Sequence, residues 1–187
     1  MPRPARYTVD VLLDAAADLL AADGPVAVTM SAVARSTGAP SGSVYHRFPT
    51  RAALCGELWL RTEERLQEAL LAALSGDDDP TRRCVSGALS VLGWCRAHPV
   101  EAQVLLAGPD QLGLGEWPDH LVGRRKRLQR RLKKVFAEIP EDAARVSAAV
   151  IDVPYAIVRR HLRARQSIPV GADAIVTDCA RALIGPS

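Results

Sequence analysis

The stretch from residue 41 to residue 46 is rich in groups that can bind an anion. Four of its side chains can form hydrogen bonds, and the glycine between them lets a partner approach the backbone closely: Ser41, Ser43, Tyr45, His46 and Gly42. If the stretch is helical, its first N–H groups and the positive end of the helix dipole also favour an anion. These residue types indicate contact with phosphate.

Two short helices must position this stretch. Helical spacing of apolar residues predicts one helix from Thr29 to about Gly38 and a second over 41–47. A connection of three or four residues that contains glycine is typical of a helix-turn-helix. We expect Val44 and Phe48 to pack inward and Tyr45 and His46 to face outward. The alternative is a surface corner without a partner, because this geometry also occurs outside DNA-binding proteins.

The rest of the chain also has the periodicity of helices. We predict an all-α fold with about nine helices and no strand. The expected ranges are 8–23, 29–38, 41–47, from 50 towards 75, 81–97, 98–107, 120–138, 140–166 with Pro154 inside it, and 171–184. The glycine-rich segment 108–119 is expected to be a mobile lid or a disordered connector.

Composition excludes several classes of protein. The 187 residues contain 4% aromatic and 24% charged residues, and no apolar run approaches the roughly 18 residues of a membrane helix. The first ten residues show no signal-peptide pattern, so we expect a cytoplasmic protein without a membrane partner. Four scattered cysteines and four histidines lack metal-binding spacing. We expect no metal, no cofactor and no catalytic group, and hence not an enzyme.

Charge is unevenly distributed although the net charge is only +3. Asp10, Asp14 and Asp18 repeat every four residues and share one face of the first predicted helix. Positive side chains surround the stretch described above: Arg35, Arg47 and Arg51. The N-terminal part can therefore present one negative and one positive surface.

The segments "LLDAAADLLAADG" and "VTMSAVARSTGAPSGSVYHRFPTRAAL" resemble the signature of the TetR/AcrR (tetracycline-repressor) family of bacterial transcriptional regulators. The resemblance covers residues 8–60. The matching positions are Gly38, Gly42, Ser43, Val44, Tyr45, Phe48, Arg51 and Leu54. This chain departs from the pattern at Pro25, where the family often has an aromatic residue. It also has Pro40-Ser41 in place of the common Ser-Lys pair, which leaves Arg47 and Arg51 to replace a phosphate-binding lysine.

The resemblance implies a DNA-binding domain over 1–60, with its helix-turn-helix at about 29–48, and a helical ligand-binding and dimerisation domain over 61–187. It implies double-stranded operator DNA as partner, and DNA contacts from Thr29, Ser41, Gly42, Ser43, Tyr45, His46 and Arg51. We add Arg35 because of its charge, although a solvated-surface role fits it equally well.

For the C-terminal part, the resemblance implies a homodimer that joins through the last two long helices and a small-molecule effector that binds inside. The interface would contain Val146, Val150 and Val158; the alternative is that these valines form intramolecular core. Trp59, Trp94, Trp117 and Tyr155 are candidate walls of the ligand pocket, or else ordinary core. The expected protein is a repressor released from a near-palindromic operator by an apolar effector.

Three alternatives concern other residues. The same scaffold could sense thiol oxidation through Cys55 or Cys95. The chain could also be a helical-bundle enzyme, but the sequence contains no recognisable set of catalytic residues. The strongly basic segment 123–136, with eight Lys and Arg residues, could bind phosphate or an anionic ligand, but a solvated helix face is the favoured interpretation.

Overall fold

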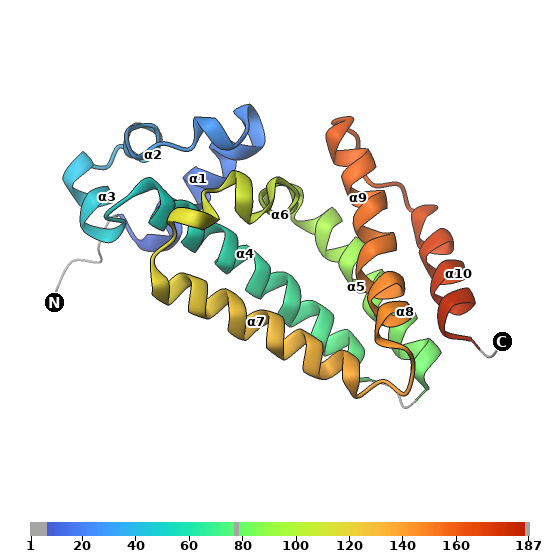
Figure 1. Cartoon of the computed structure of the whole chain (residues 1–187). Helices are drawn as coiled ribbons and strands as arrows, with labels where there is room; N and C mark the ends of the chain where they lie inside the picture. The colour runs from blue at the N-terminus through green and yellow to red at the C-terminus, as the bar shows by residue number, and fades with distance from the viewer. Residues whose placement is uncertain (1–6, 77–78, 186–187) are drawn as a thin grey trace, which may run out of the picture. The chain divides into compact units, whose positions relative to one another are not determined.

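The computed structural model describes residues 7–76 and 79–185, and the regular secondary structure of these residues is helical, without a strand (Figure 1). The all-α prediction is confirmed. The helices are α1 (Val9–Asp23), α2 (Met30–Thr37), α3 (Ser41–Arg47), α4 (Arg51–Leu74), α5 (Pro80–Ala97), α6 (Pro99–Gln111), α7 (Asp119–Ala137), α8 (Ala143–Ser147), α9 (Val153–Arg163) and α10 (Ala172–Ile184). Short 3-10 turns lie at Pro25–Ala27 and Leu114–Glu116. Within these ranges, no helix is both long and apolar enough to cross a membrane.

The chain forms two compact units. Unit 1 comprises residues 1–63 and 100–125, and unit 2 comprises 64–99 and 126–187. The helices α4 and α7 therefore supply residues to both units. The resemblance implies a boundary at residue 60 between a DNA-binding domain and a ligand-binding domain. This functional division stays a prediction.

Threonine caps set the helix starts in unit 1. The hydroxyls of Thr8, Thr29 and Thr50 accept hydrogen bonds from the backbone N–H groups of Val11, Ala32 and Ala53 at 3.2, 3.1 and 3.0 Å. Each cap satisfies a donor that the helix itself leaves without a partner. The helices α1 and α2 consequently begin within a residue of the predicted positions, and α3, which no side chain caps, also covers the predicted range 41–47.

The segment 108–119 differs from its prediction. After a kink at Gly108, whose φ is 75°, α6 continues to Gln111. Leu112 and Trp117 are buried, and the indole N–H of Trp117 donates to the carbonyl of Leu112 at 3.0 Å. This segment is therefore a packed part of unit 1, because its two large apolar side chains outweigh the turn-forming glycines.

Helices α5, α9 and α10 pack together in unit 2, with α9 and α10 side by side (Figure 1). A π-helical turn at Ala148–Asp152 joins α8 to α9, and there the N–H of Val153 donates to the carbonyl of Ala148. Pro154 explains this turn, because its ring would clash with the carbonyl of residue 150 in a regular α-helix. The helix begins at Ala143 rather than at Pro140, since the carboxylate of Asp142 caps it.

The valines predicted at a dimer interface lie inside a single chain. Val146, Val150 and Val158 are all buried in unit 2, at 0–2% exposure. That prediction is wrong for these residues. Their helix packs this apolar face on the chain's own α5 and α10, so the valines are not available to a second copy.

Candidate nucleic-acid interface

Helices α2 and α3 enclose a tight turn. Gly38 ends α2 in the left-handed conformation with φ of 67°, and the N–H of Ala39 donates back to the carbonyl of Ala34 at 3.0 Å. A left-handed residue at this point favours glycine. Only residues 38–40 separate the two helices, which is the connection expected of a helix-turn-helix.

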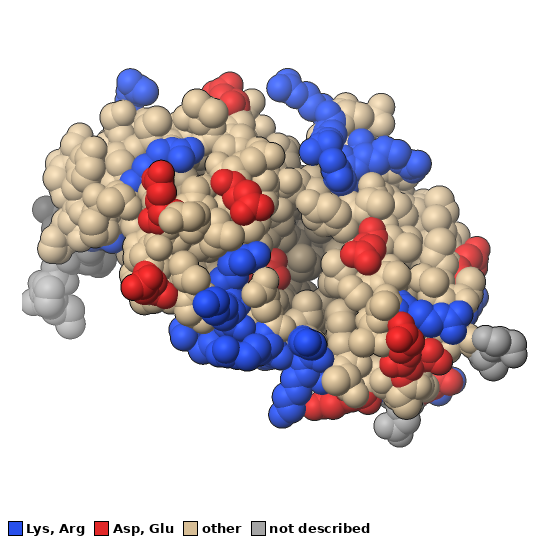
Figure 2. All heavy atoms as spheres, viewed as in Figure 1, with Lys and Arg blue, Asp and Glu red and all other residues tan. Residues whose placement is uncertain are grey.

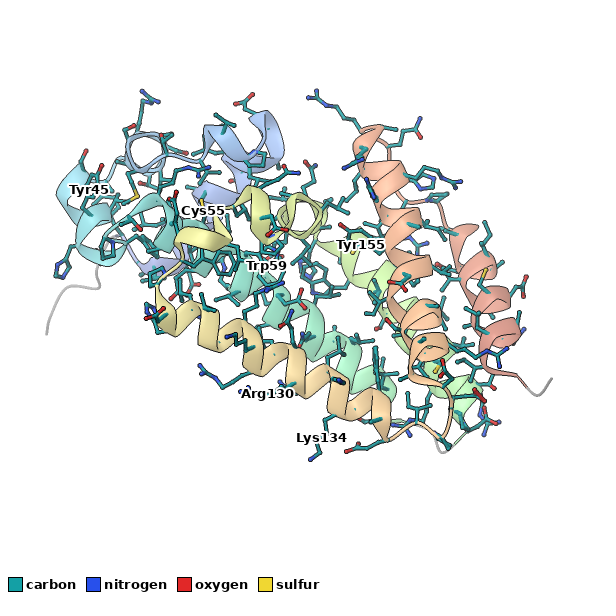
Figure 3. The ribbon with its side chains drawn as sticks, in the orientation of Figure 1. Tyr45, Cys55, Trp59, Arg130, Lys134 and Tyr155 are labelled. Carbon is teal, nitrogen blue, oxygen red and sulfur yellow. The ribbon has the colours of Figure 1, made fainter. Side chains whose placement is uncertain are left out.

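The two faces of α3 differ as the sequence predicts. Val44 and Phe48 are buried, whereas Tyr45 is 55% exposed and points away from the ribbon (Figure 3). Ser41, Gly42 and His46 are exposed as well. The outer face of α3 therefore presents hydroxyl, ring and imidazole groups together with a helix N-terminus, all of which can contact phosphates or base edges.

The other predicted contacts lie around this face. Thr29 is half-buried; its hydroxyl caps α2 and lies 3.3 Å from that of Ser31. Arg35 is exposed on α2, and Ser43 is half-buried on α3. These side chains come from consecutive elements of unit 1.

The guanidinium of Arg51 has an internal role that no local pattern in the sequence indicated. Its Nε donates to the carbonyl of Val28 at 2.7 Å, and a terminal nitrogen donates to the carbonyl of Pro25 at 2.6 Å. It fastens the start of α4 to the turn between α1 and α2. Arg47 also donates within the chain, to the carbonyl of Ser43 at 3.1 Å. Arg51 thus helps to position the helix-turn-helix, and its contact with DNA stays a prediction.

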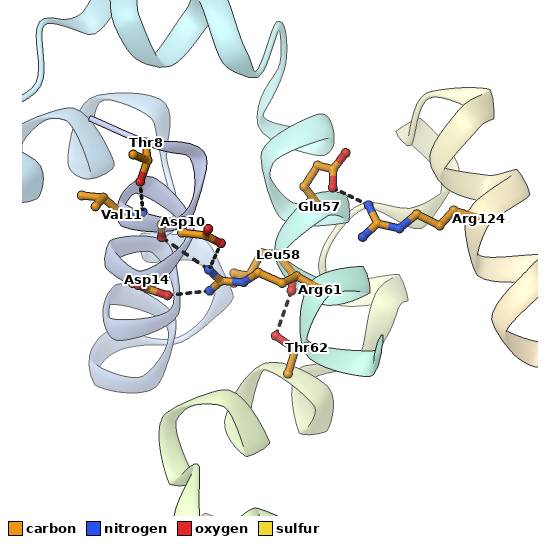
Figure 4. Close-up of polar contacts among 9 residues, drawn as sticks. All are labelled: Thr8, Asp10, Val11, Asp14, Glu57, Leu58, Arg61, Thr62 and Arg124. Atoms are coloured by element: carbon orange, nitrogen blue, oxygen red, sulfur yellow. Dashed lines mark hydrogen bonds and ion pairs between the residues drawn. The ribbon is translucent and has the colours of Figure 1, made fainter. Parts of the chain in front are cut away.

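Ion pairs hold α4 on two sides within unit 1 (Figure 4). Arg61 bonds Asp10 and Asp14 of α1 at 3.1 and 2.8 Å, and Glu57 accepts from Arg124 of α7 at 2.7 Å. The repeat of aspartates along α1 signalled a charged face, but nothing local identified Arg61 as its partner. Because Glu57 and Arg61 are one turn apart, a small rotation of α4 would disturb both contacts.

Two of the predicted pocket residues meet in unit 1. The rings of Trp59 on α4 and Trp117 lie 5.9 Å apart at 47°, and the guanidinium of Arg125 lies 5.7 Å from the centre of the Trp59 ring. In unit 2, Trp94 lies 5.0 Å from the His98 ring, and Tyr155 is 38% exposed. A role in ligand binding stays a prediction for all four.

The basic segment of α7 divides into two parts. Arg124 and Arg125 turn inward, onto Glu57 and Trp59. The remaining cations are exposed and gather along α7 (Figures 2 and 3): Lys126, Arg127, Arg130, Arg131, Lys133 and Lys134. The sequence held a signal for the inward pair, because these arginines lie three and four residues from the buried Leu121 and Leu128.

Burial makes three of the cysteines poor thiolates. Desolvation raises the pKa of the Cys55 thiol, against a smaller lowering effect of Arg51. Burial also raises the pKa of Cys84 to about 11, with Arg83 lowering and Glu141 raising it, and the pKa of Cys95 to about 12. Since the thiolate is the reactive form, these environments argue against a thiol sensor at Cys55 or Cys95.

We expect only Cys179, which is half-buried, to react quickly with a disulfide reagent near pH 8 in the native protein. The other three thiols should react after unfolding in guanidinium, and a Cys179→Ser variant should show no fast phase. The raised pKa values also mean that unfolding releases protons above about pH 9, so stability should fall as pH rises from there towards 12. Rapid reaction of Cys55 or Cys95 in the folded chain would contradict this prediction.

An exposed polar face on the second helix of a helix-turn-helix is typical of one class of protein, the DNA-binding transcriptional regulators. Residues 12–58 match the family model for bacterial regulatory proteins of the tetR family. The resemblance seen in the sequence is therefore confirmed for residues 12–58.

Solved structures share the fold over nearly the whole chain. A TetR-like transcriptional regulator from Rhodococcus sp. RHA1 is 22% identical, with 100% of both chains covered and a TM-score of 0.69. FadR from Bacillus subtilis, in complex with stearoyl-CoA, is 13% identical over 95% of this chain and 98% of that one, with a TM-score of 0.71. The ketosteroid regulator KstR2 of Mycobacterium tuberculosis is 19% identical over 98% and 97%, with a TM-score of 0.66. No curated protein matches the sequence.

Proposed function

We propose that this protein is a homodimeric, ligand-responsive repressor that binds a near-palindromic operator. The observation that carries the proposal is the outer face of α3, where Tyr45 and His46 are exposed while Val44 and Phe48 anchor the helix in the core. A dimer would place two such helices in successive major grooves, about 34–36 Å apart.

Exposed apolar side chains on α9 and α10 support the dimer. Tyr155 on α9 and Ile175 on α10, which is 50% exposed, are large apolar side chains open to solvent. Ala156 and Ala174 beside them are exposed and small enough for close helix approach. These exposed side chains replace the buried valines in the proposed interface, because a symmetric partner would cover them.

The contacts of α4 support a response to a ligand. Trp59 lies on the same helix as Glu57 and Arg61, which hold α7 and α1. A ligand beside Trp59 that prefers a shifted α4 would move α1 and, with it, the helix-turn-helix. The loss of operator affinity can be no larger than the difference between the ligand's affinities for the two positions of α4. The stearoyl-CoA bound by FadR from Bacillus subtilis carries a long acyl chain, which is consistent with an effector that has a large apolar part.

Selection of duplexes from a random DNA pool by the purified full-length protein tests the function. We expect enrichment of one sequence with two-fold symmetry, and affinity that falls steeply with salt because phosphate contacts release counterions. A Ser41→Glu variant should lose this enrichment, since its carboxylate repels phosphate at the start of α3. Ser86→Glu, which places the same charge on an exposed site of α5, is the matched control. A pool that stays random with the wild-type protein would contradict the proposal.

A further inference from the structure

The indole N–H of Trp59 is a buried donor without a partner among the described residues. The side chain is only 9% exposed, and its Nε1 atom has no acceptor. The neighbouring Trp117 differs, because its N–H donates to the carbonyl of Leu112 at 3.0 Å. A buried donor without an acceptor is costly and calls for an explanation, such as a bound water or ligand.

Arg125 adds a second donor at the same place. Its guanidinium lies 5.7 Å from the centre of the Trp59 ring, and its Nε is also buried without an acceptor. The adjacent Arg124 is neutralised by Glu57 at 2.7 Å, whereas no acidic group pairs with Arg125 in the described part of the chain. A positive charge without an acidic partner among the described residues therefore lies over the ring of Trp59, whose N–H has no acceptor there.

The surroundings of these two donors are apolar. Trp117 lies 5.9 Å from Trp59, and Leu121 comes so close to α4 that a side chain at Gly56 would lie 2.8 Å from it. Indole and guanidinium groups donate hydrogen bonds and accept none. A complementary group must therefore accept hydrogen bonds, and a negative charge on it would balance Arg125.

We propose that Trp59 and Arg125 bind the carboxylate of an effector whose remaining part is apolar. This inference rests on the proposed ligand response and specifies its chemistry. The carboxylate accepts from the Trp59 N–H and from the Arg125 guanidinium, while the Trp117 ring and Leu121 contact the apolar part. The effector is then an amphipathic acid, rather than the wholly apolar compound expected from the sequence.

Equilibrium dialysis of the full-length protein with radiolabelled octanoate and 1-octanol tests the site, because the two probes share an alkyl chain and differ in the head group. We expect octanoate to bind at least about tenfold more tightly than 1-octanol. Trp59→Phe keeps the ring and removes the donor, and Arg125→Gln removes the charge. Each should weaken octanoate binding about 10- to 100-fold, as expected for a hydrogen bond to a charged group, and leave 1-octanol binding nearly unchanged.

Arg159→Gln is the matched control, since it removes one positive charge at an exposed site in unit 2 and should change neither affinity. Equal binding of the two probes by the wild-type protein, or no binding of octanoate, would overturn the proposal without the need for any variant. Full octanoate affinity in folded Trp59→Phe and Arg125→Gln would show that a water occupies the donors instead. Operator binding measured in parallel separates this inference from the proposed function. If octanoate binds but does not release DNA, the proposed ligand response is contradicted. If DNA binds normally and octanoate does not bind, only this inference is contradicted.

Discussion

Val158→Glu is expected to unfold unit 2. Val158 is 2% exposed on the face of α9 that packs against α5, so the new carboxylate would be buried without a partner. Burying an unpaired charge removes more than about 4 kcal/mol of stability, a large share of the 5–15 kcal/mol of an ordinary domain. Urea denaturation followed by circular dichroism should show a much lower midpoint or no folded baseline.

Two further glutamates separate stability from assembly. Arg159→Glu changes the next residue along α9, which is exposed, and should alter stability by less than about 0.5 kcal/mol. Ile175→Glu should leave the chain folded but shift it from dimer to monomer in light scattering, because the charge falls on the proposed interface. A folded dimer of Val158→Glu would contradict the core placement of the valine, and a wild-type monomer at micromolar concentration would contradict the dimer.

Tyr45→Ala is expected to abolish most operator affinity without loss of stability. The ring is 55% exposed on α3, so its removal should change the free energy of unfolding by less than about 0.5 kcal/mol. Tyr45→Phe isolates the hydroxyl and should weaken operator binding by about 0.5–1.5 kcal/mol, or by up to roughly 3 kcal/mol if the bond is to a charged phosphate. A DNA titration and a melting curve on the same samples measure both effects.

Phe48→Ala provides the opposite pattern, because Phe48 is buried at the end of α3. Loss of a large core side chain should destabilise the protein by about 3–5 kcal/mol, and DNA binding should fall only through unfolding. If Tyr45→Ala instead lowered the melting temperature and left DNA binding intact, α3 would be a structural corner and not a recognition helix.

Local signals in the sequence determined the helix-turn-helix. The caps at Thr8, Thr29 and Thr50 and the left-handed turn at Gly38 depend on contacts within a few residues, so they could be predicted without tertiary structure. The same holds for the two faces of α3, since helical periodicity separates Val44 and Phe48 from Tyr45.

Tertiary structure decided which partners the long side chains and apolar faces meet. The periodicity around Val158 specified an apolar face, but a face of that kind can be covered by the same chain or by a second copy, and only packing shows that α5 covers it. Arg51 and Arg125 are similar cases. A guanidinium on a flexible stem can reach phosphate, carbonyl or indole, and elements 23 or more residues away in sequence determine that Arg51 bonds Val28 and Pro25. Sequence spacing fixes the side of a helix on which a residue lies, but long-range packing selects its partner.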